Sequence, residues 1–96
     1  MTPSQALTLH RDTIREIVLQ HGASNPRIFG SVLDHSDDEQ SDLDLLVDAG
    51  PELTLFKLAR MRAALIELLD VDIDVLTPNA LPDSFRDRVL REAEPL

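Results

Sequence analysis

The segment over residues 29–47 constrains the fold more than any other part of the chain. A Gly30-Ser31 pair ends a short apolar stretch, a polar connection follows, and Asp42 and Asp44 open a second apolar run. Side chains alternate between the two faces of an extended strand, so both aspartates point to one face and the leucines between and after them to the other. The segment therefore predicts a strand that carries two neighbouring carboxylates and buries its opposite face.

Helical and extended patterns alternate along the rest of the chain. Thr2 and Gln5 form a capping-box pattern, with Pro3 suited to the first helical position, and Thr54 can cap the next helix. The patterns predict helices over 3–21, 55–69 and 83–94, strands over 27–29, 42–47 and 71–76, and turns at 23–26 and 77–80. This order is typical of an α/β (α+β) fold, a short mixed sheet with helices packed on one face. Whether the first two strands pair parallel or antiparallel stays open.

Composition narrows the classes of partner. The 96 residues predict one domain spanning 1–96, and 18 acidic against 9 basic residues give a formal net charge of −9. Such a balance disfavours direct nucleic-acid binding and favours a cation or a basic protein as partner. The chain has no Cys and no apolar run of the ~20 residues that span a bilayer, so we predict a soluble, cytoplasmic protein. The acids of the loop over 35–40 are interpreted as solvated, without a specific role.

Three aspartates on two predicted strands suggest a chemistry. Two carboxylates about 4 Å apart repel by roughly 1 kcal/mol in water and by roughly 4 kcal/mol near a protein surface, and a divalent cation reverses that sign. Magnesium takes oxygen ligands, few of them from protein. Asp74 on the third strand can join Asp42 and Asp44 as a further ligand and proton acceptor, with Asp72 as its competitor on the same face. The pattern predicts a magnesium-dependent nucleotidyl-transfer site.

Basic and small residues near this pattern allow two interpretations each. Gly30-Ser31 is either a turn followed by a helix cap or a phosphate seat, because glycine lets the backbone approach an anion closely. Arg86, Arg88 and Arg91 on the last helix are interpreted as a solvated face, with contact to a nucleotide or a partner as the alternative.

These residues together resemble the signature of the minimal nucleotidyltransferase (MNT) antitoxin family, in the DNA polymerase β-like nucleotidyltransferase superfamily. That signature is Gly-Ser, a spacer, Asp-x-Asp and a later single Asp on a following strand. It matches Gly30, Ser31, Asp42, Asp44 and Asp74, and the resemblance covers about residues 27–96. The fold that it implies is the small nucleotidyltransferase fold.

The resemblance also implies a function. Members of this family pair with HEPN-type toxins, which are ribonucleases, and transfer AMP from ATP to a tyrosine of the toxin. On that basis we expect an AMPylating antitoxin with Mg²⁺ as cofactor and ATP as substrate, in a hetero-oligomer with its toxin. The implied metal-binding and catalytic residues are Asp42, Asp44 and Asp74, and the implied nucleotide-binding residues are Gly30, Ser31 and Ser41.

One departure from the family pattern keeps alternatives open. The family usually has a Gly, often preceded by Arg or His, where this chain has Asp34-His35. His35 can alter the turn, and Asp34 adds negative charge close to the expected triphosphate. The alternative to the enzyme is therefore a catalytically impaired protein of the same fold that neutralises the toxin by binding alone. A third hypothesis is that the chain is a small acidic cation-binding protein with no transfer activity.

Overall fold

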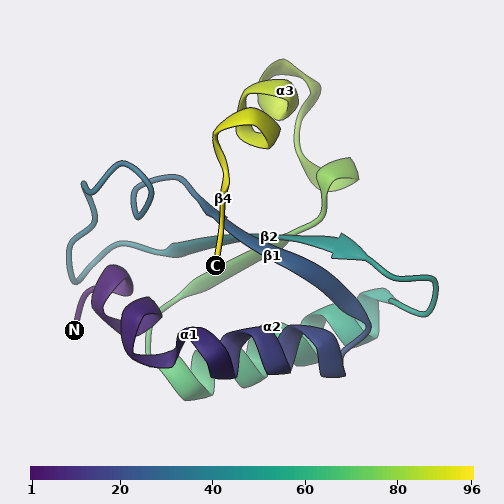
Figure 1. Ribbon diagram of the computed structural model, residues 1–96, viewed down its shortest axis with the longest axis horizontal. Helices are drawn as coiled ribbons and strands as arrows, with labels where there is room; N and C mark the ends of the chain where they lie inside the picture. Colours follow the sequence, from purple (N-terminus) through teal and green to yellow (C-terminus); the bar gives the residue numbers. More distant parts are fainter.

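The computed structural model describes all 96 residues and consists of a mixed four-stranded sheet with three α-helices (Figure 1). Its elements in chain order are α1 (Pro3–Gln20), β1 (Ala23–Phe29), β2 (Leu43–Ala49), α2 (Leu55–Leu69), β3 (Ile73–Leu76), the 3₁₀ helix η1 (Pro78–Ala80), α3 (Asp83–Glu92) and β4 (Glu94–Pro95). The strand order is β3-β2-β1-β4. β1 pairs antiparallel with both β2 and β4, whereas β2 and β3 are parallel, which confirms a mixed sheet and settles the pairing left open by the sequence.

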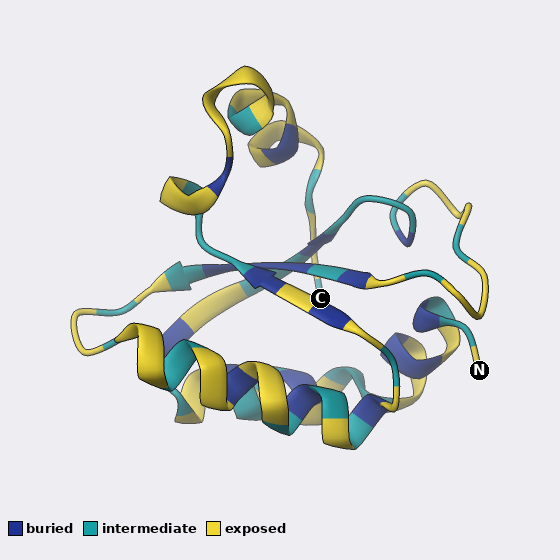
Figure 2. Cartoon of the chain, turned by 180° about the vertical axis from the view of Figure 1, so that it is seen from behind, coloured by how far each residue is buried: buried dark blue, intermediate teal, exposed yellow.

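The two faces of the sheet carry different layers. α1 and α2 cover one face, as predicted, and Leu43, Leu45 and Val47 of β2 point into the core beneath them. Leu46 points the other way and packs with Leu81 and α3, which lies on the opposite face. Figure 2 shows the buried residues along the inner sides of α1 and α2. The fold class is confirmed, with the addition that the last helix covers the second face.

The helix ends follow local sequence signals. The capping box predicted before Ala6 is present, with the Thr2 hydroxyl accepting from the Gln5 N–H and the Gln5 side chain accepting from the Thr2 N–H. The Thr54 hydroxyl caps α2, and Asp70 ends that helix in the left-handed conformation. Neither these helices nor α3 is long and apolar enough to cross a membrane.

Three strand boundaries differ from prediction by two residues or more: β2 ends at Ala49 rather than at residue 47, β3 begins at Ile73 rather than at residue 71, and the start of β1 moves furthest. β1 begins at Ala23, four residues earlier than predicted, because the turn-forming Asn25 is absorbed as a bulge with φ +51° rather than ending the strand. β4 was not predicted at all. It has only two residues, one of them a proline, and it pairs with Arg27 and Ile28 at the edge of the sheet.

One acid of the loop between β1 and β2 contacts the first helix. The N–H and the hydroxyl of Ser4 donate to the carboxylate of Asp37, at 2.9 and 2.6 Å. These hydrogen bonds lower the pKa of Asp37 below its usual value. The prediction that the acids of this loop have no role was therefore wrong for Asp37, which satisfies the first turn of α1 and anchors the loop to it.

Candidate active site

The parallel pairing of β2 with β3 places two of the three aspartates side by side. Asp44 and Asp74 are direct partners in the register, so their side chains leave the sheet on the same face. Asp42 precedes β2 by one residue and lies on that side by the same alternation. The face is the one covered by α3, since Leu46, two residues after Asp44, packs there. The three carboxylates thus gather at one end of the β2–β3 pair.

Asp44 has the most strongly shifted pKa of the chain. Partial burial of its carboxylate, followed by repulsion from Asp74 and from Asp42, raises its pKa to about 6. The four ion pairs of the protein involve other acids, namely Glu39, Asp12, Asp48 and Asp83. The three clustered carboxylates therefore have no cationic partner within the protein. Such an uncompensated cluster is the arrangement that binding of an external cation stabilises.

Asp72 and Asp74 lie differently although they share a face of the chain. The backbone carbonyl of Asp72 accepts from the Leu43 N–H at 2.8 Å, just before β3 begins. Asp72 also lines a polar cavity of about 430 Å³ with Glu39 and Asp70. Asp74, in contrast, is the register partner of Asp44 and contributes to raising its pKa. The geometry thus favours Asp74 over Asp72 as the third acid.

Gly30 sits directly against this cluster. Its φ is +76°, and a Cβ at this position would overlap a carboxylate oxygen of Asp44. No residue with a side chain fits there unless Asp44 moves, because both the backbone angle and the space require glycine. A hydrogen-bonded turn follows, in which the N–H groups of Asp34 and Ser36 donate to the carbonyls of Gly30 and Ser31. The Gly30-Ser31 pair therefore approaches the aspartates through its backbone, at a turn and not at the start of a helix.

The Asp34-His35 departure leaves this turn in place. His35 has φ +58°, in the left-handed region that a glycine adopts freely. The backbone is therefore the one that a glycine would take, at the cost of some strain at His35. Asp34 is exposed and lines a cavity next to Gly30, so the added negative charge lies beside the turn.

Ser41 has a role within the loop. Its hydroxyl accepts from the Asp38 N–H at 2.9 Å and contacts the Asp38 carboxylate at 3.2 Å, which closes the turn before β2. It also lines the 430 Å³ cavity, away from Gly30. Its assignment to nucleotide binding stays a prediction.

Comparison with known proteins places the chain in a family. The family described as "Polymerase beta, Nucleotidyltransferase" matches residues 13–96. The chain belongs to this family, which confirms both the resemblance and the prediction of a nucleotidyltransferase.

Individual relatives narrow the class further. The chain is 40% identical over 77 residues to MJ0435 of Methanocaldococcus jannaschii, a candidate protein adenylyltransferase, covering 80% of this chain and 83% of the relative. It is 31% identical to the protein adenylyltransferase MntA of Thermococcus cleftensis, covering 90% of this chain and 84% of MntA.

Solved structures agree on the fold. A candidate minimal nucleotidyltransferase superposes with a TM-score of 0.87 at 40% identity, covering 97% of this chain and 95% of the other. A toxin–antitoxin crystal structure with AMP-PNP shares the fold, with a TM-score of 0.71 at 16% identity over 97% of this chain and 71% of that one.

Proposed function

We propose that this protein transfers AMP from ATP to a tyrosine of a HEPN-type toxin, in a magnesium-dependent reaction that neutralises the toxin. The observation that carries the proposal is the register pairing of Asp44 with Asp74, beside Asp42 and without any basic partner. The three acids lie on one face of the sheet, next to a position where only glycine fits. Such a group of carboxylates suits the binding of a cation together with the phosphates of a substrate.

The donor set fits magnesium. No group of three or more His, Asp or Glu side chains in the structure is arranged to hold a metal ion, so the three aspartates do not form a metal site by themselves. Magnesium differs from other ions in needing few protein ligands, with water and substrate phosphates completing its shell. Asp42, Asp44 and Asp74 would hold it. When bound, it would neutralise these carboxylates and the charge that develops on the phosphates.

The residues of the chain then have distinct roles. The backbone at Gly30-Ser31 receives the phosphates of ATP, because Gly30 has no side chain and lies against Asp44, one of the proposed metal ligands. Asp74 is exposed, so an incoming tyrosine can reach it, and it accepts the proton of the hydroxyl. A bond forms between the tyrosine oxygen and the α-phosphorus, while the bond from that phosphorus to the leaving pyrophosphate breaks.

The toxin partner is proposed from relatives and from charge. A toxin–antitoxin complex with AMP-PNP shares the fold of this chain, and a relative at 31% identity is named as the protein adenylyltransferase MntA. The net charge of −9 suits a basic ribonuclease, because complementary potential speeds association and fixes orientation. We propose a hetero-oligomer in the cytoplasm.

Intact-mass analysis tests this function. The chain is incubated with ATP, magnesium and the toxin encoded beside it, and the toxin is expected to gain whole AMP units. Asp74→Asn and Asp72→Asn are a matched pair, since both residues are exposed acids on one face. They test whether activity requires the acid that pairs with Asp44 in the sheet or any acid nearby in the sequence. The first should abolish the mass gain and the second should leave most of it. Equal loss in both variants would contradict the assignment of Asp74.

A second function rests on Asp34. This acid lines the cavity at Gly30, where its charge opposes an incoming triphosphate. A protein that bound nucleotide poorly for this reason would neutralise the toxin by contact alone. Inhibition of the toxin with no change of its mass, in wild type and in Asp44→Ala alike, would support this alternative against AMP transfer.

A further inference from the structure

A small cavity opens directly beside the glycine of the proposed site. It has a volume of about 260 Å³ and lies between the turn after β1 and the helix α3, which stands over the sheet in Figure 1. Four of its lining residues are apolar and three are charged. Its lining residues are Phe29, Gly30, Leu33, Asp34, Phe85, Arg88, Val89 and Glu92. Gly30 also lies against the carboxylate of Asp44, so one residue of the cavity lining borders the cluster of aspartates, although none of the three aspartates lines the cavity itself.

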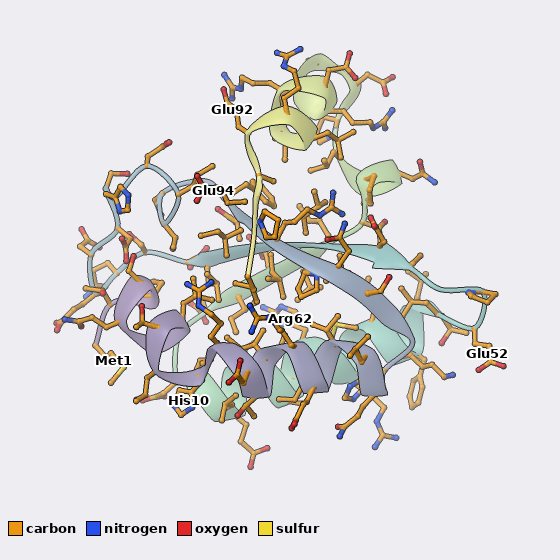
Figure 3. The ribbon with its side chains drawn as sticks, viewed as in Figure 1. Met1, His10, Glu52, Arg62, Glu92 and Glu94 are labelled. Carbon is orange, nitrogen blue, oxygen red and sulfur yellow. The ribbon has the colours of Figure 1, made fainter.

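Arg88 is the one basic residue in this cavity. The other charged groups of its lining are Asp34 and Glu92, the latter at the C-terminal end of α3 (Figure 3). Arg88 forms no ion pair with either, although Glu92 lies one helical turn away. An exposed guanidinium that leaves two nearby carboxylates unpaired has all its donors free for a ligand.

The neighbouring arginines of α3 are placed differently. Arg86 donates to the carbonyls of Pro78 and Leu81, at 2.9 and 2.7 Å, and pairs with Asp83, so it holds η1 against α3. Arg91 is exposed and does not line the cavity. The interpretation of these arginines as a solvated face is therefore wrong for Arg86, and Arg88 is the one that faces the site.

We propose that Arg88 binds the outer phosphates of the nucleotide triphosphate, an inference that rests on the proposed function. Arg88 lines the same cavity as Gly30, the residue beside which the proposed function places the phosphates. A guanidinium presents a planar fork that matches phosphate oxygens. Asp34 lies in the same cavity and opposes this contact, so the two residues set the affinity in opposite directions.

Binding measurements test this role separately from catalysis. Isothermal titration with ATP, inorganic tripolyphosphate and AMP, all with magnesium, is carried out on wild type, Arg88→Ala, Arg88→Lys and the control Arg91→Ala. We expect Arg88→Ala to weaken ATP and tripolyphosphate binding about tenfold, the effect of losing a charged hydrogen bond, while AMP binding stays the same. Arg88→Lys should recover part of the loss, and Asp34→Asn should tighten binding.

Distinct outcomes separate failure of this inference from failure of the proposed function. If Arg88→Ala binds ATP as tightly as Arg91→Ala does, Arg88 does not contact phosphate, whatever the transfer assay gives. If AMP binding falls by the same factor as ATP binding, Arg88 contacts the nucleoside, and the inference is likewise wrong. Absence of AMP transfer by wild type, with the expected pattern of binding, would overturn only the proposed function. Thermal melting checks that the variants fold.

Discussion

Asp44 should destabilise the folded protein at neutral pH when no divalent cation is present, and Asp44→Asn should therefore stabilise it. A pKa raised from 3.8 to about 6 corresponds to about 3 kcal/mol, at about 1.4 kcal/mol per pKa unit. Because the carboxylate is only half-buried, solvent screening reduces this figure. We expect the asparagine variant to gain about 1–2 kcal/mol in free energy of unfolding at pH 7.

The stabilisation by Asp44→Asn should increase with pH. A carboxyl whose pKa is raised on folding binds its proton more tightly in the folded state, so its contribution to stability falls as pH rises. For Asp44 this fall runs from about pH 4, near the unfolded pKa of 3.8, to just above the folded pKa of about 6. Urea unfolding in the presence of a chelator should therefore show nearly equal stability of the two proteins at pH 3.5, a widening gap to pH 6.5, and a constant gap above it.

Asp48→Asn is the matched control, the same substitution in the same strand. Asp48 pairs with Arg27 across the sheet, so its loss should destabilise the protein. Two results would refute the reasoning: an Asp44→Asn variant no more stable than wild type at pH 7, or a gain in stability that does not change between pH 3.5 and 7. Either would mean that burial and the repulsion from Asp74 and Asp42 do not penalise the charged form of Asp44 in the folded chain.

Three further substitutions test the surroundings of the site. Gly30→Ala should lower the free energy of unfolding by about 1–3 kcal/mol in urea, because φ is +76° and the new Cβ meets Asp44. His35→Gly should raise the melting temperature by relieving the left-handed strain at φ +58°, worth about 1 kcal/mol. Asp37→Ala should cost about 1 kcal/mol at pH 7 by removing the contacts to Ser4. Because the hydrogen bonds from Ser4 lower the pKa of Asp37 on folding, that cost should decrease as pH falls below the usual value of 3.8, which chemical denaturation at pH 7 and in acid checks.

The features predicted correctly from the sequence are those that local rules determine. The alternation around Asp42 and Asp44 predicted the strand and the shared direction of the two carboxylates, and caps at Thr2 and Thr54 marked two helix starts. The antiparallel pairing of β1 with β2 was left open because a connection of this length allows either direction. Pairing direction is decided by how the whole sheet covers its core, which no single segment contains.

The features that the sequence missed or left undecided depend on contacts between distant segments. In the sequence Asp37 is one of several acids in a polar loop. Its hydrogen bonds with Ser4 could not be predicted, because they join residues 33 positions apart. Likewise, Arg88 is one of three similar arginines on α3. Only the position of α3 over the turn after Gly30 distinguishes it from its neighbours. Sequence spacing predicts which side chains share a face of one element, but not which two elements meet.

Keeping the carboxylate of Asp44 half-buried beside two other carboxylates costs free energy, and the surrounding contacts prevent this side chain from moving away. Its carboxylate is held between Gly30, which leaves no room to withdraw, and Asp74, its fixed partner in the parallel register. A side chain in such a position would escape repulsion by rotating away if space allowed, since the neighbours offer it no cation. The loop that brings Gly30 to this point is itself anchored to α1 through Asp37. The fold thus maintains a local concentration of negative charge that bound cations and a phosphate-binding arginine would relieve, and substitutions that relax it should gain stability at the expense of activity.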